Sequence, residues 1–384
     1  MDARLGRLTR RTLLVDAGIA GALASLGALA AAPAPAAGAA SPGADALDEA
    51  LLRMAPFGPA FSGGLANHGP MVAEALVALG RSDAIAAWID GYTRRLEPWP
   101  RSGGRIARDS WAEALGRSER AADWRALFAA ELADAPLRDV LATWLPRLAP
   151  GISGSAAHGL IRVSHSVRAL AARETEPRRA ELAAGLAYWA ASYHALPDEP
   201  QPNAGLTVEQ AIRRLDVLPP ERRVQGSIVA RLERLSEVPS FARSADLVDL
   251  RPEPSALLSS VTSAFARVYV ANADQRDGRI ARLHAVTGAS ALRPLLPYVP
   301  SDAQRPLLRY AWQLGAAVYA THAQRDADAP AIQAFASADE LAARAVDSGD
   351  EHAIKLTEVC TREAALAPDP VFALAAAHWV RAST

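Results

Sequence analysis

The sequence predicts an all-α protein, a multi-helix bundle, and three observations lead to this prediction. Alanine, leucine, arginine and glutamate dominate the chain, and these residues favour helices. Apolar residues recur at three- and four-residue spacing, whereas the alternating valine, isoleucine and threonine patterns of strands are nearly absent. Proline and glycine interrupt the apolar pattern where helices are expected to begin or end.

The first 40 residues have the pattern of a twin-arginine secretion signal. Arg10 and Arg11 precede a moderately hydrophobic run that reaches Ala32, and a stretch of small residues that a signal peptidase accepts follows it. The alternative is a permanent membrane anchor, because a run of this length could just span a bilayer. We expect cleavage near residue 40 and a periplasmic or secreted protein without an anchor. Twin-arginine export carries folded proteins, so a metal loaded in the cytoplasm could travel with the chain.

Residues 41–384 are expected to form one all-α domain, with a possible division into two lobes near residues 197–205. A chain of this length can bury a large core. Loss of residues 1–40 would change the net charge from −1 to −3, because four arginines and two aspartates go. A net charge of this sign excludes the strongly basic composition that is typical of a nucleic-acid-binding protein. Cys360 is the only cysteine, so no internal disulfide can form and stability must come from the core.

The helical pattern is clearest in segments that begin near a proline or end before one. Residues 196–203 are rich in proline and cannot continue a helix, so they are predicted to form a long loop. A second break is expected across residues 239–254. No repeat of fixed period supports a helical solenoid. The predicted helices cover residues 73–79, 120–133, 178–195 and 306–323.

The chain lacks the usual motifs for nucleotides and for hydrolytic nucleophiles. Gly151-Ile152-Ser153-Gly154 has neither a preceding strand nor the remaining glycines of a phosphate-binding loop, so we interpret it as a turn that starts a helix. It also does not fit the glycine-flanked serine of a nucleophile elbow. The sequence therefore offers no flavin or nicotinamide site of the usual fold.

Four of the eight histidines share one setting, on or at the start of an expected helix and among small or apolar neighbours. Taken singly, such a histidine is more often a hydrogen-bonded core residue than a ligand. Imidazoles that converge from separate helices are nevertheless how helical bundles build metal sites. The four are His68, His158, His284 and His352.

The other histidines have different expected roles. His165 follows His158 by seven residues and so returns to the same helix face two turns later. It is a candidate catalytic base facing the substrate, or a hydrogen-bond partner that orients a ligand. His194, His322 and His378 are expected to be helix-end cations or half-buried polar residues.

Lys355 is the only lysine in the chain, beside 40 arginines. It follows His352 by three residues, so the two side chains share one face of a helix. A lysine can react as a neutral amine or take up carbon dioxide as a carbamate, which arginine cannot do. The alternative is a surface lysine left by chance. If Lys355 is buried beside the histidines, loss of hydration should lower its pKa from the usual value of about 10.4.

Several motifs occur in a characteristic order along the chain. They are Asn67-His68 with the tail Glu74-Ala75-Leu76, His158-Gly159-Leu160-Ile161-Arg162, Leu283-His284-Ala285-Val286-Thr287, and His352-Ala353-Ile354-Lys355 with Cys360. In this order and spacing the chain resembles the questin oxidase-like family over roughly residues 45–380. The resemblance implies an all-helical enzyme that opens anthraquinone rings by oxidation. This activity has been described as NADPH-dependent Baeyer–Villiger oxidation and, for one member, as dioxygenation at non-haem iron.

The resemblance also implies a ligand set of four histidines and a carboxylated lysine. Carried over by motif, these ligands are His68, His158, His284, His352 and Lys355. Imidazole and carboxylate-type oxygen suit Fe(II), although zinc or manganese could occupy the same donors. Five protein ligands would leave one octahedral position for dioxygen or a substrate oxygen.

We therefore expect a metal-dependent oxygenase that uses dioxygen to cleave a ring or a carbon–carbon bond in a small aromatic, polyketide-like molecule. One alternative is an NADPH-assisted Baeyer–Villiger-type oxidase without iron. It would need an external reductase, since no nucleotide fold is present. Another is a non-catalytic helical scaffold whose histidines are core residues. The substrate pocket should be apolar and aromatic.

Overall fold

The structure, a computed structural model, describes residues 42–224, 226–325 and 327–383. Within these residues nearly all regular structure is helical, and the one sheet is a hairpin of β1 (Ala60–Phe61) and β2 (Leu65–Ala66). The predicted all-α class is confirmed. The predicted signal, residues 1–40, lies outside the described residues. The division near residues 197–205 stays a prediction.

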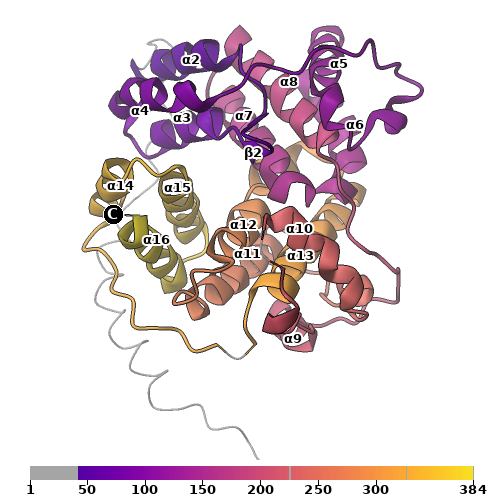
Figure 1. Ribbon diagram of the computed structural model, residues 1–384, viewed down its shortest axis with the longest axis vertical. Helices are drawn as coiled ribbons and strands as arrows, with labels where there is room; N and C mark the ends of the chain where they lie inside the picture. Colours follow the sequence, from indigo (N-terminus) through magenta and orange to yellow (C-terminus); the bar gives the residue numbers. More distant parts are fainter. Residues whose placement is uncertain (1–41, 225, 326, 384) are drawn as a thin grey trace, which may run out of the picture.

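The first helices form a group at the top of the view in Figure 1. This group consists of α2 (Pro42–Met54), α3 (Gly69–Ala78) and α4 (Ile85–Tyr92). Its members pack on one another around an apolar core that includes Leu47, Leu76 and Ile89. Pro70 stands in the first turn of α3, where its missing N–H leaves no helical bond unmade.

The second group lies beside the first. It consists of α5 (Ala121–Asp134), α6 (Leu137–Leu148), α7 (His158–Ala172) and α8 (Glu176–Ala191). Helix α7 packs between α3 and α8, and α5 covers α8. Because α7 is covered on both sides, nearly its whole length is buried.

The remaining helices complete the core. In the lower half of Figure 1 lie α9 (Val208–Arg214), α10 (Ile228–Leu232), α11 (Pro254–Ala271), α12 (Arg279–Ser290) and α13 (Ser301–His322). At the left are α14 (Ala338–Asp347), α15 (Glu351–Leu366) and α16 (Pro370–Ser383). Helix α15 contacts both α3 and α12, so it joins the first group of helices to the helices in the lower half of Figure 1. No helix in the described parts of the chain is long and apolar enough to cross a membrane.

The four predicted helices correspond to α3, α5, α8 and α13, with ends that differ by one to five residues. The largest differences are at the start of α13, at the start of α3 and at the end of α8. Helix α8 ends at Ala191 because the chain then pairs with the segment before α7, through a bridge between His194 and Ile152. The predicted loop at 196–203 is found. The predicted break at 239–254 contains a short 3-10 helix, η9 (Phe241–Asp246).

Candidate metal centre

The four histidine rings that the sequence singled out lie together, although each comes from a different part of the fold. His68 precedes α3, His158 is the first residue of α7, His284 lies within α12, and His352 is the second residue of α15. Their ring centroids form a closed circuit. The separations are 4.7 Å for His68–His158, 4.5 Å for His158–His284, 5.6 Å for His284–His352 and 4.8 Å for His352–His68.

The ring nitrogens face one another at the centre of this circuit. His158 Nε2 lies 2.8 Å from His68 Nε2 and 3.1 Å from His284 Nε2. One nitrogen from each of His68, His158 and His352 can be chosen so that all three lie within 4.8 Å of one another. With nitrogen–metal bonds of about 2.0 to 2.1 Å, two imidazoles at right angles would have nitrogens about 2.9 Å apart. The observed separations are therefore those of adjacent ligands.

Hydrogen bonds on the outer side of two rings fix their tautomers. His158 Nδ1 donates to the carbonyl oxygen of Ser155 at 2.6 Å, and His284 Nδ1 donates to that of Ile280 at 2.8 Å. If both rings are neutral, both Nε2 atoms carry lone pairs and cannot hydrogen-bond to each other. Burial is the main reason why the pKa of His158 is well below its ordinary value and that of His284 falls to about 3. Two acceptors thus face each other with no proton between them.

Lys355 is buried beside this cluster, with 2% of its surface exposed. Burial lowers the pKa of its amine to about 8, against the opposing effects of Glu351 and Asp350. Among the residues that the structure describes, no carboxylate lies within ion-pair distance of Lys355. After burial, the Lys355 charge contributes to the lowered pKa of all four histidines. Lys355 is thus not an exposed surface lysine, and the expected lowering of its pKa is found.

The model of one protein family, described as questin oxidase-like, matches residues 65–360. The chain belongs to the questin oxidase-like family. The match includes all four clustered histidines and Lys355, and membership implies an oxidoreductase. A comparison with curated proteins finds no match. The assignment of these five residues as metal ligands stays a prediction, and the site geometry is the evidence that bears on it.

In this questin oxidase-like protein, an unusual turn sets the position of His158. Ser155, Ala156 and Ala157 have φ values of 48°, 54° and 67°, a left-handed conformation that costs about 1 to 3 kcal/mol per non-glycine residue. The turn aims the Ser155 carbonyl at His158 Nδ1. Gly154 is required before it, because a Cβ there would overlap the Ser192 carbonyl. The predicted helix-start turn at residues 151–154 is found at this place.

Other residues of the site were not recognised in the sequence. The Tyr92 hydroxyl accepts the backbone N–H of His68 at 2.6 Å. Glu351 Oε1 lies 3.7 Å from His68 Nδ1, which makes no hydrogen bond within the described structure. The position of Glu351 next to His352 was a usable signal, since carboxylates often orient ligand histidines. For Tyr92 the sequence offers no signal, because the contact arises only from packing of α4 on α3.

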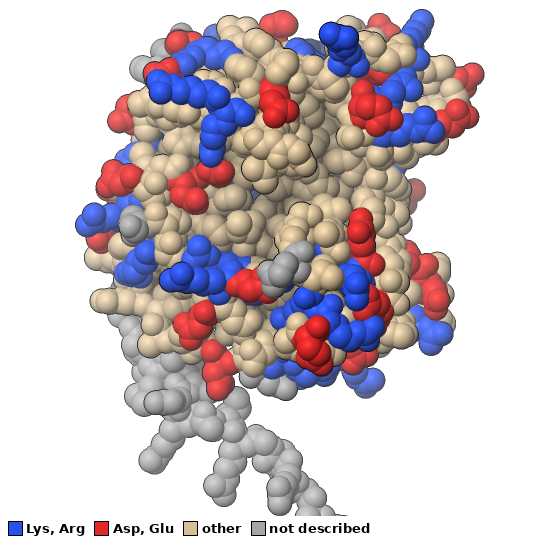
Figure 2. All heavy atoms as spheres, in the orientation of Figure 1, with Lys and Arg blue, Asp and Glu red and all other residues tan. Residues whose placement is uncertain are grey.

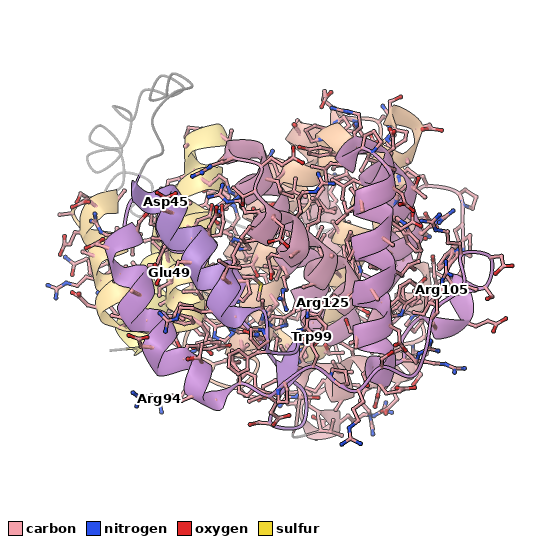
Figure 3. The ribbon with its side chains drawn as sticks, turned by 90° about the horizontal axis from the view of Figure 1, so that it is seen from above. Asp45, Glu49, Arg94, Trp99, Arg105 and Arg125 are labelled. Carbon is pink, nitrogen blue, oxygen red and sulfur yellow. The ribbon has the colours of Figure 1, made fainter. Side chains whose placement is uncertain are left out.

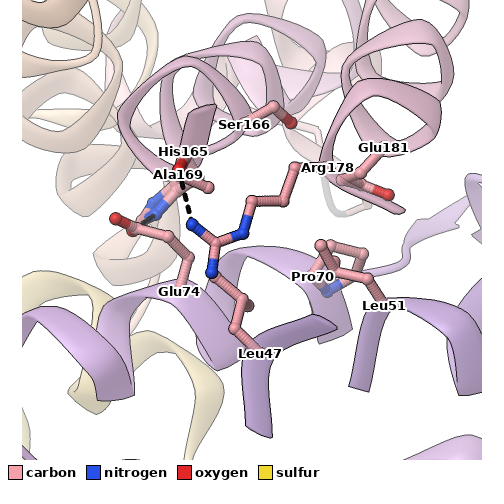
Figure 4. A pocket seen from close by; sticks show the side chains of 9 residues that line it. All are labelled: Leu47, Leu51, Pro70, Glu74, His165, Ser166, Ala169, Arg178 and Glu181. Atoms are coloured by element: carbon pink, nitrogen blue, oxygen red, sulfur yellow. Dashed lines mark hydrogen bonds and ion pairs between the residues drawn. The ribbon is translucent and has the colours of Figure 1, made fainter. Parts of the chain in front are cut away.

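His165, the predicted catalytic base, lies in a different polar environment on α7. Its Nδ1 faces Glu74 Oε2 at 2.5 Å, and Arg168 also pairs with Glu74. Burial lowers the pKa of His165, although Glu74 opposes that change. The cavity beside it, shown in Figure 4, has a volume of only about 10 Å³, room for about one water. A substrate does not fit there, and a catalytic role for His165 stays a prediction.

The three remaining histidines lie away from the cluster. His194 follows the end of α8, with Nδ1 3.1 Å from Ser153 Oγ, and His378 Nδ1 lies 2.6 Å from the Tyr269 hydroxyl. His322 is the last residue of α13 but is fully buried. Burial, helped by neighbouring arginines, lowers its pKa to about 3. The expectation of a helix-end cation or half-buried residue is therefore wrong for His322.

Proposed function

We propose that this member of the questin oxidase-like family is a metal-dependent oxygenase with non-haem iron as its cofactor. It would use dioxygen to cleave a ring or a carbon–carbon bond in an aromatic, polyketide-like small molecule. The observation that carries the proposal is the contact of His158 Nε2 with His284 Nε2 at 3.1 Å, where both atoms are acceptors. A cation between such lone pairs removes their repulsion. Burial of the cluster would then keep water from the reacting groups.

The charge of the cluster supports a modified Lys355. If Lys355 were an ammonium, its positive charge would repel a divalent cation held by the neutral imidazoles. A neutral amine can add to carbon dioxide and release a proton, and the carbamate so formed is an anion with oxygen donors. Lys355 is buried, has no carboxylate partner among the described residues and has a lowered pKa, which all favour the neutral amine. We propose that His68, His158, His284, His352 and carboxylated Lys355 hold the metal.

The metal would supply activation of dioxygen, and this requirement favours iron over zinc. Zinc has no redox chemistry, and manganese would bind to the same donors with a different potential. If both oxygen atoms enter the product, the reaction needs no nicotinamide. An external reductase fed by NADPH would be required only if one oxygen atom left as water. His165 remains the candidate base, although its recorded contacts are with Glu74.

Metal analysis with oxygen-consumption assays tests this function. We expect about one iron ion per chain after anaerobic reconstitution, with turnover of an aromatic substrate for iron and none for zinc. His284→Gln should lose the metal. His194→Gln is the matched control, since that histidine lies outside the cluster, and it should keep the metal. Metal-free protein that turns over with NADPH and a reductase would instead support the oxidase without iron. No metal and no turnover would support the scaffold.

We also propose that the protein is exported through the twin-arginine route, on the basis of Arg10 and Arg11 and the small-residue run that follows. Replacement of both arginines by lysine should leave the precursor in the cytoplasm. Fractionation with N-terminal sequencing of the periplasmic protein measures this. Unchanged export of the double variant would contradict the proposal, and a processed terminus far from residue 40 would contradict the cleavage site.

A further inference from the structure

A second cavity lies on the surface near the β-hairpin and is large enough for a small molecule. Its volume is about 270 Å³, close to the lower limit of about 300 Å³ for ligand pockets. Figure 2 shows this face hollowed near β2, with uncharged residues in the hollow. The lining is mainly proline and alanine with a few polar groups. It consists of Pro59, Ala60, Glu97, Pro98, Pro100, Ser118, Ala121, Tyr188, Ala191 and Ser192.

One wall of this cavity is held in place by the helix beside it. The ring of Trp99 lies under the guanidinium of Arg125, with 4.8 Å between the guanidinium carbon and the ring centre (Figure 3). Both side chains also donate to the carbonyl oxygen of Ala55, at 3.1 Å from Trp99 and 3.3 Å from Arg125. These bonds fix the segment that carries Pro98 and Pro100, so the cavity is formed before any ligand binds.

The cavity is linked to the histidine cluster through Tyr188. The Tyr188 hydroxyl lies 2.5 Å from Ser155 Oγ, and the carbonyl oxygen of Ser155 accepts the Nδ1 proton of His158. If Ser155 donates to Tyr188, the Tyr188 O–H is free to donate to a ligand. A molecule in the cavity would therefore contact the turn that positions a candidate metal ligand.

A guanidinium with an unused donor interacts electrostatically with Tyr188, although it is not itself one of the residues that line the cavity. Arg162 is one turn after His158 on α7 and has 3% of its surface exposed. Its Nε and Nη2 donate to Glu181 at 2.6 and 2.8 Å, whereas Nη1 is buried and makes no hydrogen bond in the described structure. A buried donor without a partner is unusual and costly. Arg162 also interacts electrostatically with the hydroxyls of Tyr188 and Tyr92, which flank the cluster.

We propose that the cavity binds the aromatic substrate and that the Tyr188 hydroxyl donates to an acceptor oxygen on it, a ring carbonyl or a phenolate, while the nearby Arg162 guanidinium stabilises negative charge on that oxygen. This inference rests on the proposed function for the choice of an aromatic substrate. Glu181 already compensates most of the arginine charge, so the ligand oxygen need not carry a full charge. The Tyr188 contact would orient the ring toward the side of the cluster where His158 lies.

Ligand-observed NMR titration of the metal-free protein tests this site without metal, dioxygen or turnover. The probes are 1-tetralone, 2-naphthol and naphthalene, which share a two-ring skeleton and differ in their oxygen. We expect one of the oxygenated probes to bind roughly five- to tenfold more tightly than naphthalene. Preference for 1-tetralone would identify a carbonyl, and preference for 2-naphthol a phenol or phenolate. Equal binding of all three, or no binding, would overturn the proposal.

Two variants test whether Tyr188 and Arg162 cause the preference for an oxygenated probe over naphthalene. Tyr188→Phe should reduce binding of the preferred probe several-fold and leave naphthalene unchanged. The double variant Arg162→Gln and Glu181→Gln keeps a neutral hydrogen-bonding pair, so it avoids a buried unpaired carboxylate, and it should act in the same way. Arg138→Gln is the control, because this guanidinium lies outside the cavity and donates to the Pro297 carbonyl oxygen, and it should keep the preference. A preference retained in both test variants, or an equal loss for naphthalene, would show that Tyr188 and Arg162 do not act on the ligand oxygen.

The two proposals fail separately. Turnover by a metal-loaded protein that lacks the oxygen preference would refute the binding site and leave the proposed function standing. Selective binding by a protein that holds no metal and shows no turnover would refute the proposed oxygenase and leave the donor site standing.

Discussion

Two buried polar clusters share the same three helices and differ in how their charges are balanced. The starts of α3, α7 and α15 bring His68, His158, His352 and Lys355 to the candidate metal centre, and α12 adds His284. Later turns of these helices bring Glu74, His165, Arg168, Glu358, Arg362 and Glu363 to a network of ion pairs. The two clusters can be compared directly, because both are buried and both draw side chains from these helices.

The ion-pair network is closed. Arg168 pairs with both Glu74 and Glu358, and Arg362 joins Glu358 to Glu363. Arg293 adds a further pair to Glu363 at 2.5 Å. Each carboxylate therefore has at least one guanidinium partner, and the attraction offsets the cost of removing the charges from water. The pKa of Glu358 falls to about 2 because these arginines outweigh the effect of burial.

The histidine cluster is open, in the sense that its charged group has no ion-pair partner in the described part of the chain. Its titratable groups are bases, its ring nitrogens face one another, and its one amine, Lys355, has no ion pair among the described residues. Glu351 is the nearest acid, 3.7 Å from His68 Nδ1 and 3.6 Å from Arg95. The difference teaches that the network balances its own charges, whereas the histidine cluster has no such ion pairs of its own within the described structure, and the proposed metal with a carbamate on Lys355 would complete it.

The largest expected effect comes from Lys355→Arg. Arginine keeps the positive charge but cannot form a carbamate, so it leaves a cation beside the metal position. Loss of an outer hydrogen-bond partner already costs roughly 10- to 100-fold in metal affinity, so loss of a direct ligand should exceed that. We expect metal content and oxygenase turnover to fall to background, measured by metal analysis and oxygen uptake.

Lys355→Ala separates the carbamate from a simple packing role. The alanine variant should also lose the metal, and added bicarbonate or a short carboxylic acid should partly restore it by filling the vacated ligand position. Full metal content and activity in the arginine variant would falsify the carbamate hypothesis. Lys355 would then be a buried lysine without a role at the metal.

A smaller effect, on stability rather than on metal binding, is expected from Glu358→Gln. This change removes one of the two carboxylate partners of Arg168 and of Arg362, which keep Glu74 and Glu363. Loss of hydrogen bonds to charged groups costs about 1.5 to 3 kcal/mol of the free energy of unfolding. Urea denaturation measures the loss, and metal binding by the folded fraction should be little changed.

Thr357→Val is the matched control for that experiment. Thr357 lies on α15 between the two clusters, and its hydroxyl is buried without a hydrogen bond in the described structure. Its replacement should leave both stability and metal binding close to those of the parent protein. Loss of metal in the Glu358 variant to the same degree as in the Lys355 variants would mean that the two clusters are not independent.

The sequence predicted the all-α class and the residues that meet at the cluster, but not how they meet. Helical periodicity is local, and a lone lysine three residues from a histidine is visible in the chain. The left-handed turn at Ser155 to Ala157 could not be predicted, because alanine rarely adopts that conformation and the turn is imposed by packing on α8. The electrostatic interaction of Arg162 with Tyr188 arises only through the pairing of α7 with α8. Contacts between distant segments leave little trace in one sequence.

The smallest expected effect is on the pH dependence of the free energy of unfolding of the metal-free protein, which differs between the two clusters. The pKa of His284 falls from 6.5 to about 3 on folding, so between these values the unfolded chain binds more protons than the folded one. The stability that neutral His284 contributes is present above pH 6.5 and is lost as the pH falls toward 3. At pH 5 this loss is about 2 kcal/mol for His284 alone. Glu358 loses its contribution only between about pH 4.5 and 2.

The window between pH 7 and 5 therefore reports on the histidines and not on Glu358. We expect the free energy of unfolding, measured by urea denaturation with a chelator present, to fall with pH in this window. In His284→Gln the fall should be smaller by about 2 kcal/mol. His322 titrates in the same window but is present in both proteins, so the difference isolates the cluster. An identical pH dependence in the two proteins would mean that His284 is solvated in solution, and the contrast between an open and a closed cluster would fail.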